Sequence, residues 1–258
     1  MPTFLSTLKR RSVVLYVCGL VCLIGCVVCI GLSLTTTQQV MGANAFIKPA
    51  KFFVSIWLFA WTMGWYVGLL PQQRAARVYA WVIVIGMSIE LAIVLWQASH
   101  GQLSHFNISS PLNGLLFSVM GIIITIITLW NAYIGYLFMV QRPAGLSASY
   151  LWAIRLGIVV FVLFSFQGFM MAGRLAHTVG APDGGPGLPV LNWSTRYGDL
   201  RIAHFFGMHA LQLIPLFGYY VARRPRHVIL ASAIYFILLT GLLMQALAGK
   251  PLLATLSH

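Results

Sequence analysis

The chain has 258 residues, of which 60% are hydrophobic and only 7% are charged. A soluble domain carries about 25% charged residues, so this composition excludes a soluble globular protein and predicts an all-α, multi-pass membrane protein. The 16 Lys and Arg residues against three acids give a formal net charge of +13. Basic residues of this kind hold cytoplasmic loops in place. No loop is long enough to build a basic face for nucleic acid, so nucleic-acid binding is not expected.

Seven apolar segments are predicted to cross the bilayer as one bundle, a single domain over residues 1–258. The first follows the basic string Lys9-Arg10-Arg11 and is too long to be the apolar core of a signal peptide. Most of the others are a little over 20 residues, enough to span a hydrocarbon core about 30 Å thick. The predicted spans cover about residues 12–34, 51–70, 78–98, 114–139, 150–173, 201–222 and 228–248.

The Lys and Arg residues predict the orientation of the bundle. One set of span ends holds nine of them, namely Lys9, Arg10, Arg11, Arg74, Arg77, Arg142, Arg223, Arg224 and Arg226. The other set holds six, namely Lys48, Lys51, Arg174, Arg196, Arg201 and Lys250. Because cytoplasmic loops carry the excess of positive charge, we expect the N-terminus inside and the C-terminus outside. The long connectors 35–50, 99–113 and 174–200 then all lie on the outer side.

All four cysteines, Cys18, Cys22, Cys26 and Cys29, lie on one stripe of the first span, within about 80° of one another. Thiolates bind soft metals, but one helix cannot wrap four ligands around one ion. The stripe is therefore interpreted as small apolar packing residues at a helix interface.

The sixth span begins with a string that is unusually polar for a membrane helix. Arg201, His204, Met208 and Gln212 fall within about 80° on a helix, and His209 lies about 60° further round. Polar groups inside a membrane are costly unless they meet partners or water. Asp199, just before the span, either caps the helix or binds a ligand, and Arg201 either serves the site or extends to lipid head groups.

Glu90 is the only acid inside an apolar span. It is expected about 12 Å below the outer surface, and His209 about 13 Å below it, so we predict that the two face each other across the third and sixth spans. Other large polar side chains concentrate in the outer half of the spans, namely Gln97, Gln167, His204, Gln212 and Gln245. This asymmetry predicts an intramembrane polar pocket that opens to the outer side.

Further candidates lie at the outer ends of the spans. His105 and Asn107 belong to the loop that follows the Glu90 span, and they are either pocket residues or interfacial polar residues. Lys48 and Lys51 begin the second span, where lysines either bind an anionic group or anchor the helix at the membrane surface.

Three strings carry a resemblance to a known family. KPAKF (residues 48–52), SHFN (104–107) and GDLRIAHFFGMHALQ (198–212) resemble strings of an uncharacterised family of bacterial polytopic inner-membrane proteins. The resemblance covers most of the chain. It implies a bacterial inner-membrane setting and brings no activity with it.

Three functions stay open. The first is a redox protein with a haem or transition-metal cofactor held by His204, His209 and His105 beside Gln212, which acts on a quinone-like or lipid-like partner. Its chemistry would fall to Glu90, His209 and Arg201, and its substrate to Lys48, Lys51, Asn107 and Asp199. The second is a proton-coupled transporter of small solutes that uses Glu90 and His209. The third is a structural membrane subunit, so enzymatic activity and oligomeric state are not decided at this level.

Overall fold

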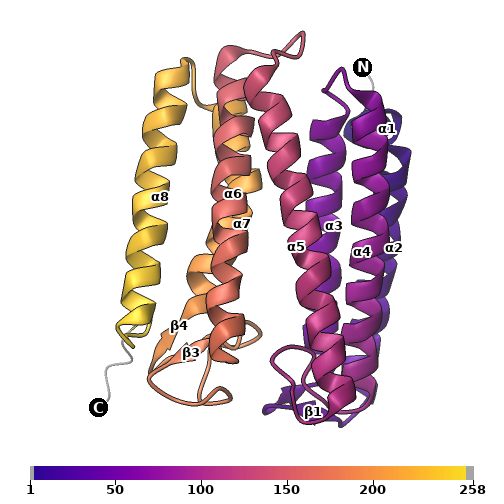
Figure 1. Cartoon of the computed structure of the whole chain (residues 1–258), viewed down its shortest axis with the longest axis vertical. Coiled ribbons are helices and arrows are strands. Elements are labelled where there is room, and N and C mark those ends of the chain that lie inside the picture. Colours follow the sequence, from indigo (N-terminus) through magenta and orange to yellow (C-terminus); the bar gives the residue numbers. More distant parts are fainter. Residues whose placement is uncertain (1–2, 254–258) are drawn as a thin grey trace. The chain divides into compact units, whose positions relative to one another are not determined.

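The computed structural model describes residues 3–253, and helices dominate it (Figure 1). The helices are α1 (Phe4–Arg11), α2 (Val13–Thr35), α3 (Ile47–Val67), α4 (Gln73–Ser99), α5 (Pro111–Val140), α6 (Ala148–Arg174), α7 (Leu200–Tyr220) and α8 (Pro225–Leu247). The strands are two-residue pieces in loops: β1 (Gln39–Val40) with β2 (Ala43–Asn44), and β3 (Thr178–Val179) with β4 (Gly198–Asp199). The all-α prediction is confirmed. The predicted outer C-terminus, His258, lies outside the described residues.

Six of these helices, α2 and α4 to α8, are long and apolar enough to cross a bilayer, so the chain is a multi-pass membrane protein. The seventh predicted span corresponds to α3, which has 21 residues but carries Lys48, Lys51 and three tryptophans and is not among these six helices. The observed helix bounds also differ from the predicted ones. For example, α4 begins at Gln73 rather than near residue 78, because the helix continues through Arg74 and Arg77 beyond the apolar stretch.

The chain divides into two compact units, Met1–Trp130 and Asn131–His258. The first unit contains α1 to α4 and most of α5. The second contains the end of α5 and α6 to α8. Each unit has its own core and is described by itself, so the prediction of one domain over residues 1–258 stays a prediction.

In the first unit, α2 and α3 pack side by side along most of their length. Cys22, Cys26 and Cys29 are buried in this interface with Phe53 and Ile56 of α3, as the packing interpretation of the cysteine stripe predicts. The first residues form a helix of their own that the sequence analysis missed. In α1, Leu8 is fully buried, and the Arg11 guanidinium lies 3.8 Å from the ring centre of Trp65 at the end of α3.

In the second unit, α6 and α7 form the closest helix pair. Gly207 of α7 faces Phe164 of α6 so closely that an added Cβ would collide with the Phe164 side chain. The buried Arg155 of α6 donates to the carbonyls of Phe138 (2.7 Å), Met139 (3.2 Å) and Gln141 (3.0 Å). These are the last carbonyls of α5 and the residue after it, which have no partner within their own helix. Arg155 therefore caps a helix end with positive charge, which suits the helix dipole.

Candidate functional site

The candidate site is built on one side of α7, which we call the α7 polar face: Arg201, His204, Met208, His209 and Gln212. The helix covers Leu200–Tyr220 and includes Pro215, so the predicted sharing of one helical side by these residues is confirmed. Gly207, Ala210 and Ile214 lie on the buried side of the same helix. The polar side chains are only partly buried, so they form an accessible edge of the second unit.

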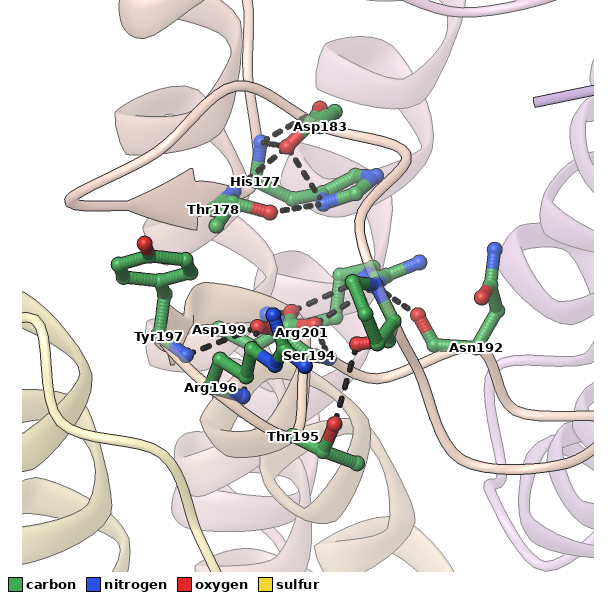
Figure 2. A network of polar contacts seen from close by, with 11 residues as sticks. His177, Thr178, Asp183, Asn192, Ser194, Thr195, Arg196, Tyr197, Asp199 and Arg201 are labelled. Carbon is green, nitrogen blue, oxygen red and sulfur yellow. Dashed lines mark hydrogen bonds and ion pairs between the residues drawn. The ribbon is translucent and has the colours of Figure 1, made fainter. Parts of the chain in front are cut away.

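Asp199 and Arg201 fasten the start of α7. Asp199 is fully buried and is the N-cap of the helix, since its Oδ1 accepts the Arg201 backbone N–H at 3.0 Å. The Arg201 guanidinium donates to the same carboxylate with two of its nitrogens, Nε at 2.9 Å and Nη2 at 2.6 Å. Oδ2 also accepts the Ser194 N–H at 2.9 Å, and Arg201 donates to the Asn192 carbonyl (Figure 2). The capping interpretation of Asp199 is thus confirmed, while substrate binding by Asp199 and catalysis by Arg201 stay predictions.

A second carboxylate organises the far part of the same loop. Asp183 accepts the backbone N–H groups of His177 (3.1 Å) and Thr178 (2.8 Å) and pairs with His177 Nδ1 at 2.9 Å (Figure 2). Although partial burial raises the pKa of Asp183, the hydrogen bonds from His177 and Thr178 and the neighbouring His177 charge lower it well below its usual value. The sequence analysis did not single out this residue. Its Pro-Asp-Gly setting, typical of a turn held by an Asp side chain, is the signal that could have found it.

The loop closes onto α7 through a short sheet and a run of aromatic rings. Strands β3 and β4 pair antiparallel, with Thr178 opposite Asp199. The buried Trp193 contacts Phe205 and Phe206, with ring centres 5.4 Å and 6.1 Å apart. The Phe205 ring in turn lies edge-on to the His209 ring at 4.3 Å. A run of aromatic rings therefore extends from the loop to His209.

His204 is held in one orientation by α6. Its Nδ1 lies 2.8 Å from the Phe164 carbonyl oxygen. Because a carbonyl can only accept, Nδ1 carries the hydrogen, and Nε2 of the neutral ring keeps its lone pair. The ring rests against Gly168, where an added Cβ would lie 3.2 Å from Cε1. Met208, one turn further on, accepts the Ser165 hydroxyl at 3.2 Å.

Gln167, next to Gly168 in the sequence, is a buried amide with no hydrogen bond. Neither its Oε1 nor its Nε2 has a hydrogen-bond partner within the described part of the chain. Sequence analysis places it among the polar residues of the outer half. A buried amide without partners is rare in proteins, and where it occurs it commonly marks a functional position.

The first unit contains Glu90, which is 3% exposed. One turn before it Gly86 packs against Ile127 of α5, and one turn after it Ile93 packs with Met120. Glu90 lies between these contacts on the same side of α4, so it points toward α5 into apolar surroundings. Its Oε1 has no hydrogen-bond partner among residues 3–253.

Towards the end of α4, a chain of side-chain hydrogen bonds runs to the loop between α4 and α5. Gln97 donates to Asn113 (2.9 Å), Asn113 to Ser109 (3.0 Å) and Ser109 to Asn107 (2.7 Å). Asn107 ends the chain at the Leu103 carbonyl (3.0 Å). The predicted site residue Asn107 is therefore connected to α4 through the exposed Ser109 and the buried Asn113.

His105 lies beside α3, the helix that carries the two lysines, in the first unit. The His105 ring lies 5.4 Å from the ring of Phe52, which follows Lys51 in α3. Its Nδ1 is 3.0 Å from the Ser104 hydroxyl. Lys48 and Lys51 sit at the start of α3, so the loop and this helix end belong to one neighbourhood.

The predicted site residues divide between the units. The first unit contains Glu90, His105, Asn107, Lys48 and Lys51, and the second contains Asp199, Arg201, His204, His209 and Gln212. The meeting of Glu90 with His209, and the metal ligand set His105, His204 and His209, both draw on the two units and stay predictions. Within residues 3–253, no three His, Cys, Asp or Glu side chains gather in a way that could hold a metal ion.

Comparisons of the chain with protein-family models, with curated proteins and with solved structures give no match. The function is therefore argued from the geometry of the two units. The best-defined chemical group is His204, with its fixed ring, its small neighbour Gly168 and the hydrogen-bond-free amide of Gln167 nearby in the sequence.

Proposed function

We propose that the chain is a redox protein of the bacterial inner membrane that binds haem through His204 and exchanges electrons with a quinone-like partner beside His209. The observation that carries the proposal is the hydrogen bond from His204 Nδ1 to the Phe164 carbonyl. Histidines that bind metals almost always donate their other ring N–H to a carbonyl or carboxylate, which fixes the ring and increases the basicity of the ligating nitrogen. The porphyrin supplies the other ligands, so one oriented histidine is a sufficient protein anchor.

The neighbours of His204 suit a flat cofactor. Gly168 leaves the edge of the imidazole ring uncovered by a side chain, and the Gln167 amide offers a donor and an acceptor that the protein itself does not use. Haem supplies one-electron chemistry when bound. The chain's own contribution is to orient His204 through the Phe164 carbonyl.

A quinone-like partner is favoured by the rings around His209. Phe205 lies edge-on to the His209 ring, and both belong to the run of rings that begins at Trp193. Aromatic side chains bind flat rings well, and an imidazole can donate a hydrogen bond to a carbonyl oxygen. His209, supported by Gln212, would thus hold a quinone carbonyl within the membrane.

The test is visible absorption of the purified protein, with a haem assay after alkaline pyridine treatment. We expect a haem spectrum in the wild type and its loss in His204→Ala. His100→Ala is the matched control, because His100 is an exposed histidine of the first unit whose Nδ1 also lies 2.8 Å from a backbone carbonyl, that of Trp96. A folded wild-type protein that is colourless after haem supply would end the proposal, as would unchanged haem content in His204→Ala.

A second candidate is a proton-coupled transporter, and Glu90 is the observation that favours it. A carboxyl buried against apolar residues, with an oxygen that accepts no hydrogen bond, typically takes up and releases protons during transport. Glu90→Gln keeps the shape of the side chain but cannot carry a proton. If Glu90→Gln abolishes proton flux in liposomes and His204→Ala leaves the flux unchanged, the transporter is favoured over the haem protein.

The same proposal includes seven spans with the N-terminus inside and the C-terminus outside. Helix α3 supports it, since 21 residues extend about 31 Å, the thickness of a hydrocarbon core. It also packs against both α2 and α4, which are candidate spans themselves.

A further inference from the structure

A groove of about 450 Å³ opens on the first unit, and none of the predicted site residues lines it. Its two walls are α2 and α4, and Ile56 of α3 forms part of its floor. Cys22, Ile56 and Leu91 on the floor are buried, whereas Val17 and Trp81 on the rims are about half exposed. A volume of this size lies in the range of about 300–1,000 Å³ that is typical of small-ligand sites.

The length and the lining of the groove match one lipid chain. Along α4 it extends from Trp81 to Leu91, ten residues or about 15 Å. That is about half of a hydrocarbon core of 30 Å, the depth of a single leaflet. The lining is apolar apart from Ser88 and the thiols of Cys18 and Cys22, so the groove suits a hydrocarbon chain.

The charges at one end of the groove point to the head group. Arg74 and Arg77 are exposed in the first turns of α4, and Arg77 lies one turn before Trp81 on the same side of the helix. Lys9 and Arg10 are exposed at the end of α1, just before the α2 residues that line the groove. The only acid in residues 1–130 is Glu90, which is buried inside α4. The four cations therefore have no carboxylate of their own unit beside them.

From this arrangement we propose that the groove is a binding site for an anionic phospholipid of the surrounding bilayer. One acyl chain lies between α2 and α4, and the phosphate is held by Arg74 and Arg77. A neutral lipid or an isoprenoid tail fills the groove equally well but leaves the arginines without a counter-charge. A second copy of the chain, related by a two-fold axis along the membrane normal, would place the same cations opposite each other at one depth, which is repulsive.

Fluorescence quenching of Trp81 tests the proposal. The protein is placed in phosphatidylcholine discs that contain a small share of phosphatidylglycerol with brominated acyl chains, and the Trp81 signal is the difference between wild type and Trp81→Phe. We expect half-quenching at an about 25-fold lower share of brominated phosphatidylglycerol than of brominated phosphatidylcholine, because each of the two arginines near the anionic head group contributes about fivefold.

Two variants separate head-group from chain recognition. The double variant Arg74→Gln/Arg77→Gln should lose the preference for phosphatidylglycerol, whereas Arg223→Gln/Arg224→Gln in the second unit, the matched control, should retain it. Ser88→Phe should weaken quenching by both lipids, since it fills the groove.

Three results would overturn the proposal. The first is equal quenching of the wild type by the two brominated lipids. The second is a preference for phosphatidylglycerol that survives in Arg74→Gln/Arg77→Gln. The third is a Trp81 that neither lipid quenches, in a protein that cross-linking through the groove shows to be a dimer.

Discussion

At the scale of single residues, the three acids of the chain divide into two kinds. Asp183 and Asp199 are fully engaged in holding the loop that covers the start of α7. Glu90, in contrast, is surrounded by apolar side chains. Arg201 is likewise engaged by Asp199, so within the proposed function it is a positioning residue that fastens the loop to the start of α7.

Replacing Asp199 tests this loop anchor. Asp199→Ala removes the N-cap, the acceptor of the Ser194 N–H and the counter-charge of Arg201, so we expect a loss of about 3 kcal/mol or more in the free energy of unfolding. Asp199→Asn, the matched control, can still cap the helix and should lose less. Thermal unfolding in detergent, followed by circular dichroism, measures both. An Asp199→Ala protein as stable as the wild type would show that the anchor contributes nothing.

The interactions of Asp183 with His177 and Thr178, which we call the Asp183 clamp, predict that the stability of this loop depends on pH. A carboxyl whose pKa is lower in the folded than in the unfolded protein contributes stability above its unfolded pKa, and this contribution is lost as the pH falls through the folded value. The clamp should therefore hold down to a pH well below the usual titration of a carboxyl. Hydrogen exchange of the His177 and Thr178 amides, measured from neutral to acidic pH, checks this. In Asp183→Asn these amides should exchange faster already at neutral pH, and protection that is equal in both proteins would refute the clamp.

At the scale of helices, close backbone approach holds α6 and α7 together. Gly207→Ala would drive a Cβ into Phe164, so we expect a loss of about 1–3 kcal/mol from overpacking. Gly241→Ala is the matched control, because it makes the same change in α8 where no atom lies within 4 Å, and a gain of up to about 1 kcal/mol is expected there. Apparent melting temperatures of the two variants should move in opposite directions. Equal shifts in the melting temperature would mean that α6 and α7 move apart to accommodate the added Cβ without loss of stability.

The proposed haem site makes a second prediction for the α6–α7 pair. If His204 holds haem against Gly168, then Gly168→Ala should lower haem retention, since the added Cβ would lie 3.2 Å from the imidazole. Gly173→Ala near the end of the same helix has open space at its Cβ and serves as the control. The ratio of Soret to protein absorbance after purification is the measurement. Equal ratios in both variants would argue against a haem packed beside Gly168.

At the scale of the whole molecule, the crossing of α3 determines the topology. Reporters inserted at Gly42, before α3, and at Pro71, after it, should report opposite compartments, with Gly42 outside. A reporter after Arg142 should report the cytoplasm, and one after His258 the outer side. These outcomes rest on the excess of Lys and Arg on the inner ends. If the reporters at Gly42 and Pro71 report the same compartment, α3 does not cross the membrane. The chain would then have six spans, with both termini on the same side.

What the sequence determined by itself is the long apolar helices and the side of the helix on which their residues lie, but not the short helix α1. Runs of about 20 apolar residues have no alternative to helix in a membrane, because every backbone polar group must be satisfied within its own segment. The side shared by Arg201, His204, Met208 and Gln212 follows from helical periodicity alone, as does the stripe of cysteines that packs against α3.

Only the tertiary structure decided which partners the polar groups meet. Asp199 could cap a helix or bind a ligand, and its burial beside Arg201 and Ser194 assigns it to the cap. The orientation of His204 depends on a carbonyl 40 residues earlier in the chain, and Arg155 serves the end of another helix. Such contacts join residues far apart in the sequence, and local periodicity carries no information about them. The groove between α2 and α4 arises for the same reason, since it depends on how two helices diverge rather than on either helix alone.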